Sequence, residues 1–116
     1  MKPLLLVMPR HGKLPQNAYH IAVVPQTANV IAKEIISYGL GGKNTITLSS
    51  RNDDGCMLSL QRNLITLSGK KLERQEILLP PLHKPEEALA IAGALLAADC
   101  PPSQLKNRMK EYHLLN

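Results

Sequence analysis

A glycine-rich segment in the middle of the chain contains residue types that bind phosphate groups. Gly41 and Gly42 precede Lys43, so backbone amides lie next to an ammonium group. A phosphate-cradling loop also needs an earlier glycine, and a Ser or Thr after the lysine whose hydroxyl holds Mg²⁺. These two positions are occupied by Ser37 and Asn44. The segment therefore does not match a nucleotide triphosphate site, and we interpret it as a strand-to-strand turn that is a candidate site for a small anionic ligand.

A second group that could do chemistry follows the first aliphatic run. The Arg-His-Gly tripeptide at residues 10–12 resembles the opening motif of the histidine phosphatase (phosphoglycerate mutase-like) superfamily. The resemblance implies that His11 is phosphorylated and that Arg10 grips the phosphate oxygens. Arg51 would be a second phosphate clamp. The family's second His lies next to Gly, whereas His83 precedes a Lys, so this phosphoryl-transfer activity is kept as an alternative.

The apolar spacing in the first part of the chain indicates the elements that must position these residues. Residues 4–8 and 21–24 are continuous aliphatic runs, which predict buried strands. Thr27 predicts the N-cap of a short helix that ends near Glu34. A further strand is expected at 35–38, before the glycine turn. This strand–helix–strand order predicts parallel strands joined by a crossover helix.

The pattern changes in the middle of the chain. Residues 45–49 alternate between polar and apolar side chains, and short strand-like pieces follow at 57–60, 64–67 and 76–79. Turn-forming residues separate these pieces. The pattern predicts an antiparallel meander.

Two helices are predicted at the end of the chain. The first runs from Pro85 to Ala98, since proline suits the first helical turn. The second begins after Ser103 as its N-cap, and an apolar stripe at helical spacing is formed by Leu105, Met109 and Tyr112. We therefore predict one domain, residues 1–116, of the α/β class. It has a short, mostly parallel sheet extended by an antiparallel meander, with helices packed against it.

A longer resemblance covers about residues 20–114. The strand at 21–24, the sequence YGLGG at 38–42 and the sequence LPPLHKPEEALA at 79–90 follow one another in order. This order is similar to the latter half of the central domain of Mur ligases and folylpolyglutamate synthetases, which reads AVVNADD, YGLG and LPGxHNxxNALA. The segment at 101–105 falls where this family has its IPLEDI helix start.

The departures from the family pattern bear on function. These ligases phosphorylate a carboxylate with ATP and let an amine attack it, using a P-loop, a carbamylated Lys and acids that bind Mg²⁺. The chain matches neither the P-loop half nor the C-terminal domain, and the NADD acids correspond to Pro-Gln-Thr at 25–27. Lys84 and Glu87 replace the Asn pair of the family, and only His83 is retained. The resemblance implies a non-catalytic module, without cofactor or metal, that binds a partner protein or a small ligand. The candidate ligand-binding residues are His83, Lys84, Gly41, Gly42 and Lys43. One subunit of a split ATP-dependent amide ligase is a further alternative.

Composition and charge limit the partners. The 116 residues carry a formal net charge of +5, but aromatic residues make up only 3%, with no Phe and no Trp. The chain thus has few rings for base stacking and no recognised nucleic-acid motif, so we expect no nucleic-acid partner.

No apolar run is long enough for a membrane span, and Cys56 and Cys100 lack CxxC spacing, which favours reduced thiols in the cytoplasm. Because a half-domain exposes the edge of its sheet, we expect homodimers or a partner protein.

Overall fold

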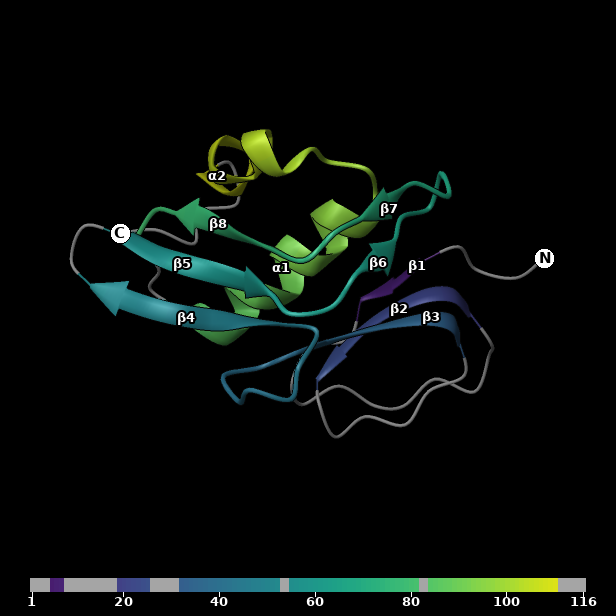
Figure 1. Cartoon of the computed structure of the whole chain (residues 1–116), viewed down its shortest axis with the longest axis horizontal. Coiled ribbons are helices and arrows are strands. Elements are labelled where there is room, and N and C mark those ends of the chain that lie inside the picture. The colour runs from purple at the N-terminus through teal and green to yellow at the C-terminus, as the bar shows by residue number, and fades with distance from the viewer. Residues whose placement is uncertain (1–4, 8–18, 26–31, 53–54, 82–83, 111–116) are drawn as a thin grey trace.

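One mixed sheet forms the centre of the molecule, as the sequence predicted for an α/β chain. The computed structural model describes residues 5–7, 19–25, 32–52, 55–81 and 84–110 (Figure 1). The strand order in the six-stranded sheet is β1-β2-β3-β4-β5-β8. These strands are β1 (Leu5–Val7), β2 (Tyr19–Pro25), β3 (Ala32–Tyr38), β4 (Ile46–Asn52), β5 (Gly55–Leu60) and β8 (Gln75–Leu79). Two short strands, β6 (Leu64–Ile65) and β7 (Lys71–Leu72), form a separate antiparallel pair.

The first half of the sheet is parallel. β1 pairs with β2 from Leu5↔Ile21 onwards, and β2 pairs with β3 along its length. The helix predicted to end near Glu34 is wrong in its last three residues, because 32–34 begin β3 instead. Ala, Lys and Glu are good helix formers in isolation, but pairing with β2 overrides this weak local preference. Residues 27–31 of that predicted helix lie outside the described residues.

The second half of the sheet is antiparallel. β4 pairs with β5, and β5 pairs with β8, which confirms a meander at this place. The piece predicted at 64–67 is a strand only over its first two residues and pairs with β7, outside the main sheet. The two halves of the sheet meet at a single parallel pair, Tyr38↔Ile46.

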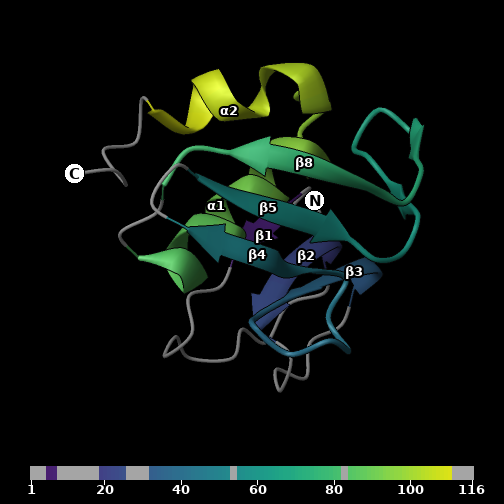
Figure 2. The same ribbon diagram turned by 60° about the vertical axis from the view of Figure 1, so that its left-hand side comes forward.

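Helix α1 (Pro85–Ala97) crosses behind both halves of the sheet (Figure 2). Its buried residues are mostly small: Ala88, Leu89, Ala90, Ala92, Gly93, Leu96 and Ala97. Small side chains let the helix backbone lie close to the sheet, and Gly93 marks the closest approach. A Cβ added there would lie 2.8 Å from Val23 Cγ1 and 3.1 Å from Ile46 Cδ1. The glycine therefore fits the helix against both halves of the sheet at once.

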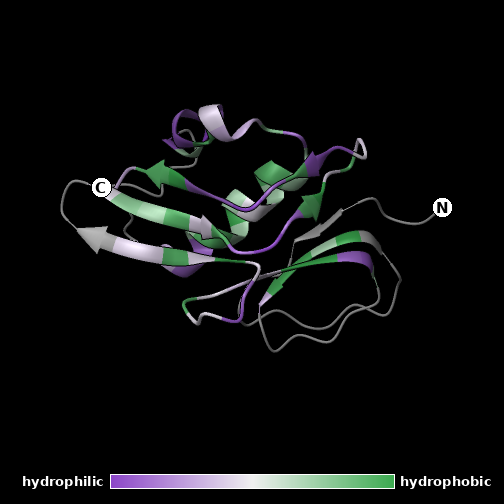
Figure 3. Ribbon diagram, viewed as in Figure 1, coloured by the Kyte–Doolittle hydropathy of each residue, from purple (hydrophilic) through white to green (hydrophobic). Residues whose placement is uncertain are grey.

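Helix α2 (Pro102–Lys110) is amphipathic and packs beside β8. Figure 3 shows α2 mainly in purple and white, whereas α1 is mainly green and pale. The predicted stripe is confirmed for Leu105 and Met109, both fully buried, while Tyr112 lies outside the described residues. The predicted cap is wrong: Ser103 is inside the first turn, because the helix already begins at Pro102, which suits this position.

The C-terminal end of α1 has a Schellman motif with aspartate where glycine is usual. Cys100 N–H donates to the Leu95 carbonyl at 2.9 Å, and Asp99 N–H donates to the Leu96 carbonyl at 3.2 Å. Asp99 has φ 70°, the left-handed conformation that most side chains avoid. Its negative charge also lies at the end of the helix that favours positive charge. Other contacts must therefore hold this residue.

The β6–β7 hairpin supplies these contacts. The Ser68 and Thr66 hydroxyls donate to Asp99 Oδ1 at 2.6 and 2.5 Å, and Ser68 N–H donates to Asp99 Oδ2 at 3.0 Å. Leu67 N–H also donates to the Ala97 carbonyl at 2.8 Å. The hydrogen bonds from Ser68 and Thr66 hold the pKa of Asp99 below its usual value, since they stabilise the carboxylate. The hairpin is thereby fastened to the end of α1.

Candidate functional site

The glycine turn predicted from sequence lies between β3 and β4, at residues 39–45. At its base, Ser37 and Thr45 exchange hydrogen bonds: Thr45 N–H donates to Ser37 Oγ at 2.9 Å, and Ser37 N–H donates to Thr45 Oγ1 at 3.2 Å. Within the turn, the Asn44 side-chain amide donates to the Gly41 carbonyl at 2.8 Å. The turn is therefore closed by its own side chains, and it leaves Gly41 and Gly42 exposed.

Two side chains that follow β5 hold the same turn from outside. The Gln61 amide donates to the carbonyls of Gly42 and Asn44 at 2.9 and 2.8 Å. The Arg62 guanidinium donates to the Lys43 carbonyl at 3.1 Å. These contacts use carbonyl oxygens, whereas a phosphate cradle needs backbone N–H groups that converge. The arrangement agrees with the interpretation of this segment as a strand-to-strand turn.

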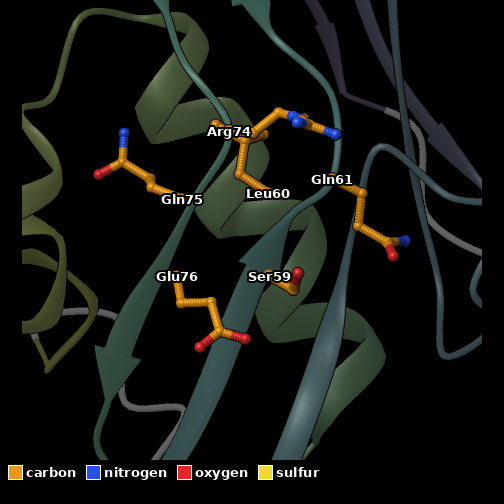
Figure 4. Close-up of a pocket in the computed structure, with 6 residues that line it drawn as sticks. All are labelled: Ser59, Leu60, Gln61, Arg74, Gln75 and Glu76. Carbon is orange, nitrogen blue, oxygen red and sulfur yellow. The ribbon is translucent and has the colours of Figure 1, made fainter.

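A shallow polar depression adjoins the turn, on the face of the sheet away from α1 (Figure 4). It has a volume of about 380 Å³ and is lined by Ser59, Leu60, Gln61, Arg74, Gln75 and Glu76. Ser59 and Glu76 are opposite each other in the β5–β8 register. Gln61 belongs to both features, because it lines the depression and its amide holds the turn. The depression and the turn thus form one continuous surface.

Basic side chains surround this surface. Lys43 extends from the turn, Arg62 lies beside it, and Arg74 lines the depression; all three are exposed. Arg74 N–H donates to Asn63 Oδ1 at 2.9 Å, which ties the start of β8 to the segment that follows β5. The acidic residue in the depression is Glu76. The surface can therefore offer positive charge at its rim and one carboxylate at its centre.

The structure separates the predicted ligand-binding residues into two groups. Gly41, Gly42 and Lys43 lie in the turn, whereas Lys84 stands at the start of α1, where its ammonium is 4.0 Å from the Glu87 carboxylate. Both side chains of that pair are more than half exposed. Lys84 is thus engaged within its own helix. His83 lies outside the described residues.

The residues of the phosphatase alternative fall largely beyond the described part of the chain. Arg10 and His11 lie outside it. Arg51 belongs to β4, where its backbone is opposite Cys56 in the register with β5, but its side chain is outside the described residues.

Sequence reasoning missed Gln61, Arg62 and Arg74. The first two were interpreted as part of a spacer between strands, and Arg74 carried no motif. The signal that could have found them is positional, since each stands at the end or the beginning of a predicted strand. Their meeting depends on the pairing of β5 with β8, which the local sequence does not encode.

The described residues contain neither a metal-binding cluster nor a helix that could cross a membrane. No three His, Cys, Asp or Glu side chains within these ranges gather as a metal site would require. Cys56 is buried and Cys100 half-buried, neither forms a disulfide, and burial raises the pKa of the Cys100 thiol. Neither described helix has the length and apolar composition needed to cross a bilayer. Comparison with protein-family models, curated proteins and solved structures yields no match.

Proposed function

We propose that this chain is a non-catalytic module, similar to the latter half of a Mur ligase central domain, that binds a partner protein through its sheet. The order of elements supports the resemblance. A parallel strand at 19–25, a strand that leads into the glycine turn, an antiparallel hairpin and two helices follow one another in the order that the resemblance implies. The resemblance also implies a helix between the first two strands, but Ala32, which would belong to it, begins β3.

The chemistry of the turn and of the start of α1 supports the non-catalytic part of the proposal. The carbonyls of Gly42, Lys43 and Asn44 accept hydrogen bonds from Gln61 and Arg62, so this backbone serves to hold the turn. At the start of α1, charged side chains replace the amides that the resemblance places near nucleotide. We therefore expect no ATP hydrolysis and no measurable affinity for Mg·ATP.

The observation that carries the proposal is the exposure of large apolar side chains on the face of the sheet opposite α1. Helix α1 packs against the side on which Ile36 and Ile77 are buried. Alternation along each strand directs Ile35 and Leu78 to the opposite side, and these side chains remain 50% and 55% exposed. On that side Ala22 and Val24 of β2 are buried, so the exposed apolar side chains lie on β3 and on β8. We propose that another protein contacts the sheet at these two strands.

The edge of the sheet adds a second reason. β1 is the last strand of the order, beside β2, which is where the resemblance places strands that this chain does not match. Edge strands present backbone groups that can pair with another chain. We propose that the partner is a second copy of the chain. Two copies would present the same face and the same edge strand to each other, so a purified sample contains everything that this association needs.

Two measurements test this function. Light scattering of the purified full chain should give a mass that rises with concentration toward twice 12.8 kDa. A mass of one chain at every concentration would contradict the proposal. Calorimetry with Mg·ATP should give no heat of binding, and micromolar affinity would favour the split-ligase alternative.

A further inference from the structure

Three basic residues lie around the turn and the depression although they come from separate parts of the chain. Lys43 lies between β3 and β4, Arg62 follows β5, and Arg74 precedes β8. Two contacts hold these segments together: the guanidinium of Arg62 donates to the Lys43 carbonyl, and the backbone N–H of Arg74 donates to Asn63 Oδ1. The fold thus assembles a positive cluster that no run of basic residues in the sequence reveals.

The described part of the chain places one carboxylate, that of Glu76, in the depression beside this cluster. The ion pair found in that part of the chain joins Lys84 to Glu87 at the start of α1, and none involves Lys43, Arg62 or Arg74. Guanidinium groups keep their charge at any physiological pH and are suited to bind carboxylates. A carboxylate that reached Lys43 or Arg74 would therefore gain charge-assisted hydrogen bonds without displacing a side-chain partner, whereas Arg62 also donates to the Lys43 carbonyl.

Ser59 and Glu76, which form the floor of the depression, suit hydrogen-bond donors of a ligand and not its carboxylates. The Ser59 hydroxyl and the Glu76 carboxylate lie on neighbouring strands, and within the described ranges neither side chain makes a hydrogen bond. A hydroxyl offers a donor and an acceptor, while a carboxylate offers acceptors alone. A ligand that suits both parts must carry carboxylates toward the rim and N–H donors toward the floor. A peptide with acidic side chains has both.

The described side chains argue against a nucleic-acid ligand. Base stacking needs exposed rings, and of the side chains that the structure describes, the aromatic one is Tyr38, which is 2% exposed.

We infer that the depression and the adjoining turn form a binding site for an acidic peptide segment, held at its carboxylates by Lys43, Arg62 and Arg74. The site lies on the same face of the sheet as Leu78, which follows Glu76 by two residues in β8. A bound peptide and a second copy would therefore compete for this part of the face, and variants of Arg74 and of Leu78 separate the two.

The test is fluorescence anisotropy with a fluorescein-labelled peptide of alternating Glu and Gly. The peptide should bind the full chain at low salt and dissociate as salt rises, because exposed charge pairs are screened. Arg74→Gln should weaken binding about fivefold, and Arg74→Gln with Lys43→Gln about twentyfold. Arg108→Gln, which removes the same charge from α2, should leave binding unchanged and is the matched control.

Several results would overturn the inference. These are equal binding by the Arg74→Gln and Arg108→Gln proteins, equal binding of a Gln-Gly peptide, or tighter binding of a single-stranded oligonucleotide of the same length. Arg62 also holds the turn, so Arg62→Gln is used only with circular dichroism to show that the fold persists. Light scattering of Arg74→Gln should still show self-association, which separates failure of this site from failure of the proposed function.

Discussion

The contact between Gly93 and the sheet allows a quantitative prediction about stability. In Gly93→Ala, the added methyl group would lie 2.8 Å from Val23 Cγ1, 3.1 Å from Ile46 Cδ1 and 3.7 Å from Ile36 Cγ2. The first distance is shorter than side chains tolerate, and Val23 is a stiff β-branched residue with no exposed surface into which it could move. The helix and the sheet must therefore move apart.

Two opposing effects determine the size of the change. Alanine raises helix propensity by about 1 kcal/mol over glycine. Overpacking of a well-filled core costs about 1–3 kcal/mol. Since the clash involves both halves of the sheet, we expect the upper part of that range and a net loss of about 1–2 kcal/mol in the free energy of unfolding. The melting temperature should fall by roughly 4–8 °C.

Urea unfolding followed by far-ultraviolet circular dichroism measures this loss. Gly42→Ala is the matched control, because an added Cβ at Gly42 meets nothing within 4 Å. The control should unfold within about 0.5 kcal/mol of the native chain. A Gly93→Ala protein as stable as the native chain would refute the reasoning, since it would mean that α1 can leave the sheet at little cost.

The remaining predictions concern the hairpin contact and the turn. The pKa of Asp99 is lower in the folded chain than its ordinary value of 3.8. Its carboxylate therefore stabilises the fold at a pH above 3.8, and this stabilisation is lost as the pH falls through the lower pKa of the folded state. Asp99→Asn keeps an acceptor oxygen and tolerates the left-handed conformation. The difference in free energy of unfolding between the native and variant chains, measured by urea unfolding from pH 6 to about 2, should therefore become smaller in acid. A difference that stays constant over this pH range would contradict the prediction. Gln61→Ala removes the two hydrogen bonds to the Gly42 and Asn44 carbonyls and should lower the free energy of unfolding by about 1–2 kcal/mol, with faster amide hydrogen exchange in the turn. Gln104→Ala, at an exposed position of α2, should change neither quantity, and equal effects of the two variants would remove the structural role of Gln61.

The parts of the fold that the sequence predicted are those with a strong local pattern. Residues 21–24 form a buried strand because four aliphatic residues in succession suit a parallel strand covered on both faces. Helix α1 was predicted to within one residue at its C-terminal end, since its proline start and its run of small and aliphatic residues are local signals.

The errors occur where distant contacts decide the structure. Residues 32–34 favour a helix locally, yet they lie in β3 because β2 provides backbone partners along its length. The left-handed conformation of Asp99 depends on hydroxyls that precede it by about thirty residues. Local sequence does not encode such partners.

The candidate site shows the same division. Gly41, Gly42 and Lys43 were singled out by composition, and the structure places them in a turn whose carbonyls are held by Gln61 and Arg62. The basic rim with Arg74 depends on the register of β5 against β8. Recognising it from sequence would require knowledge of the strand pairing.

The central claim, association through the face of the sheet opposite α1, is tested most directly by a pair of variants. Ile35→Thr combined with Leu78→Thr removes the exposed apolar side chains of that face and keeps residues that suit strands. Leu40→Thr removes an equally exposed apolar side chain from the turn and serves as the control. In light scattering over a wide concentration range, the native chain and the control should approach twice 12.8 kDa, whereas the double variant should remain at the mass of one chain. A double variant that associates as strongly as the native chain would contradict the account.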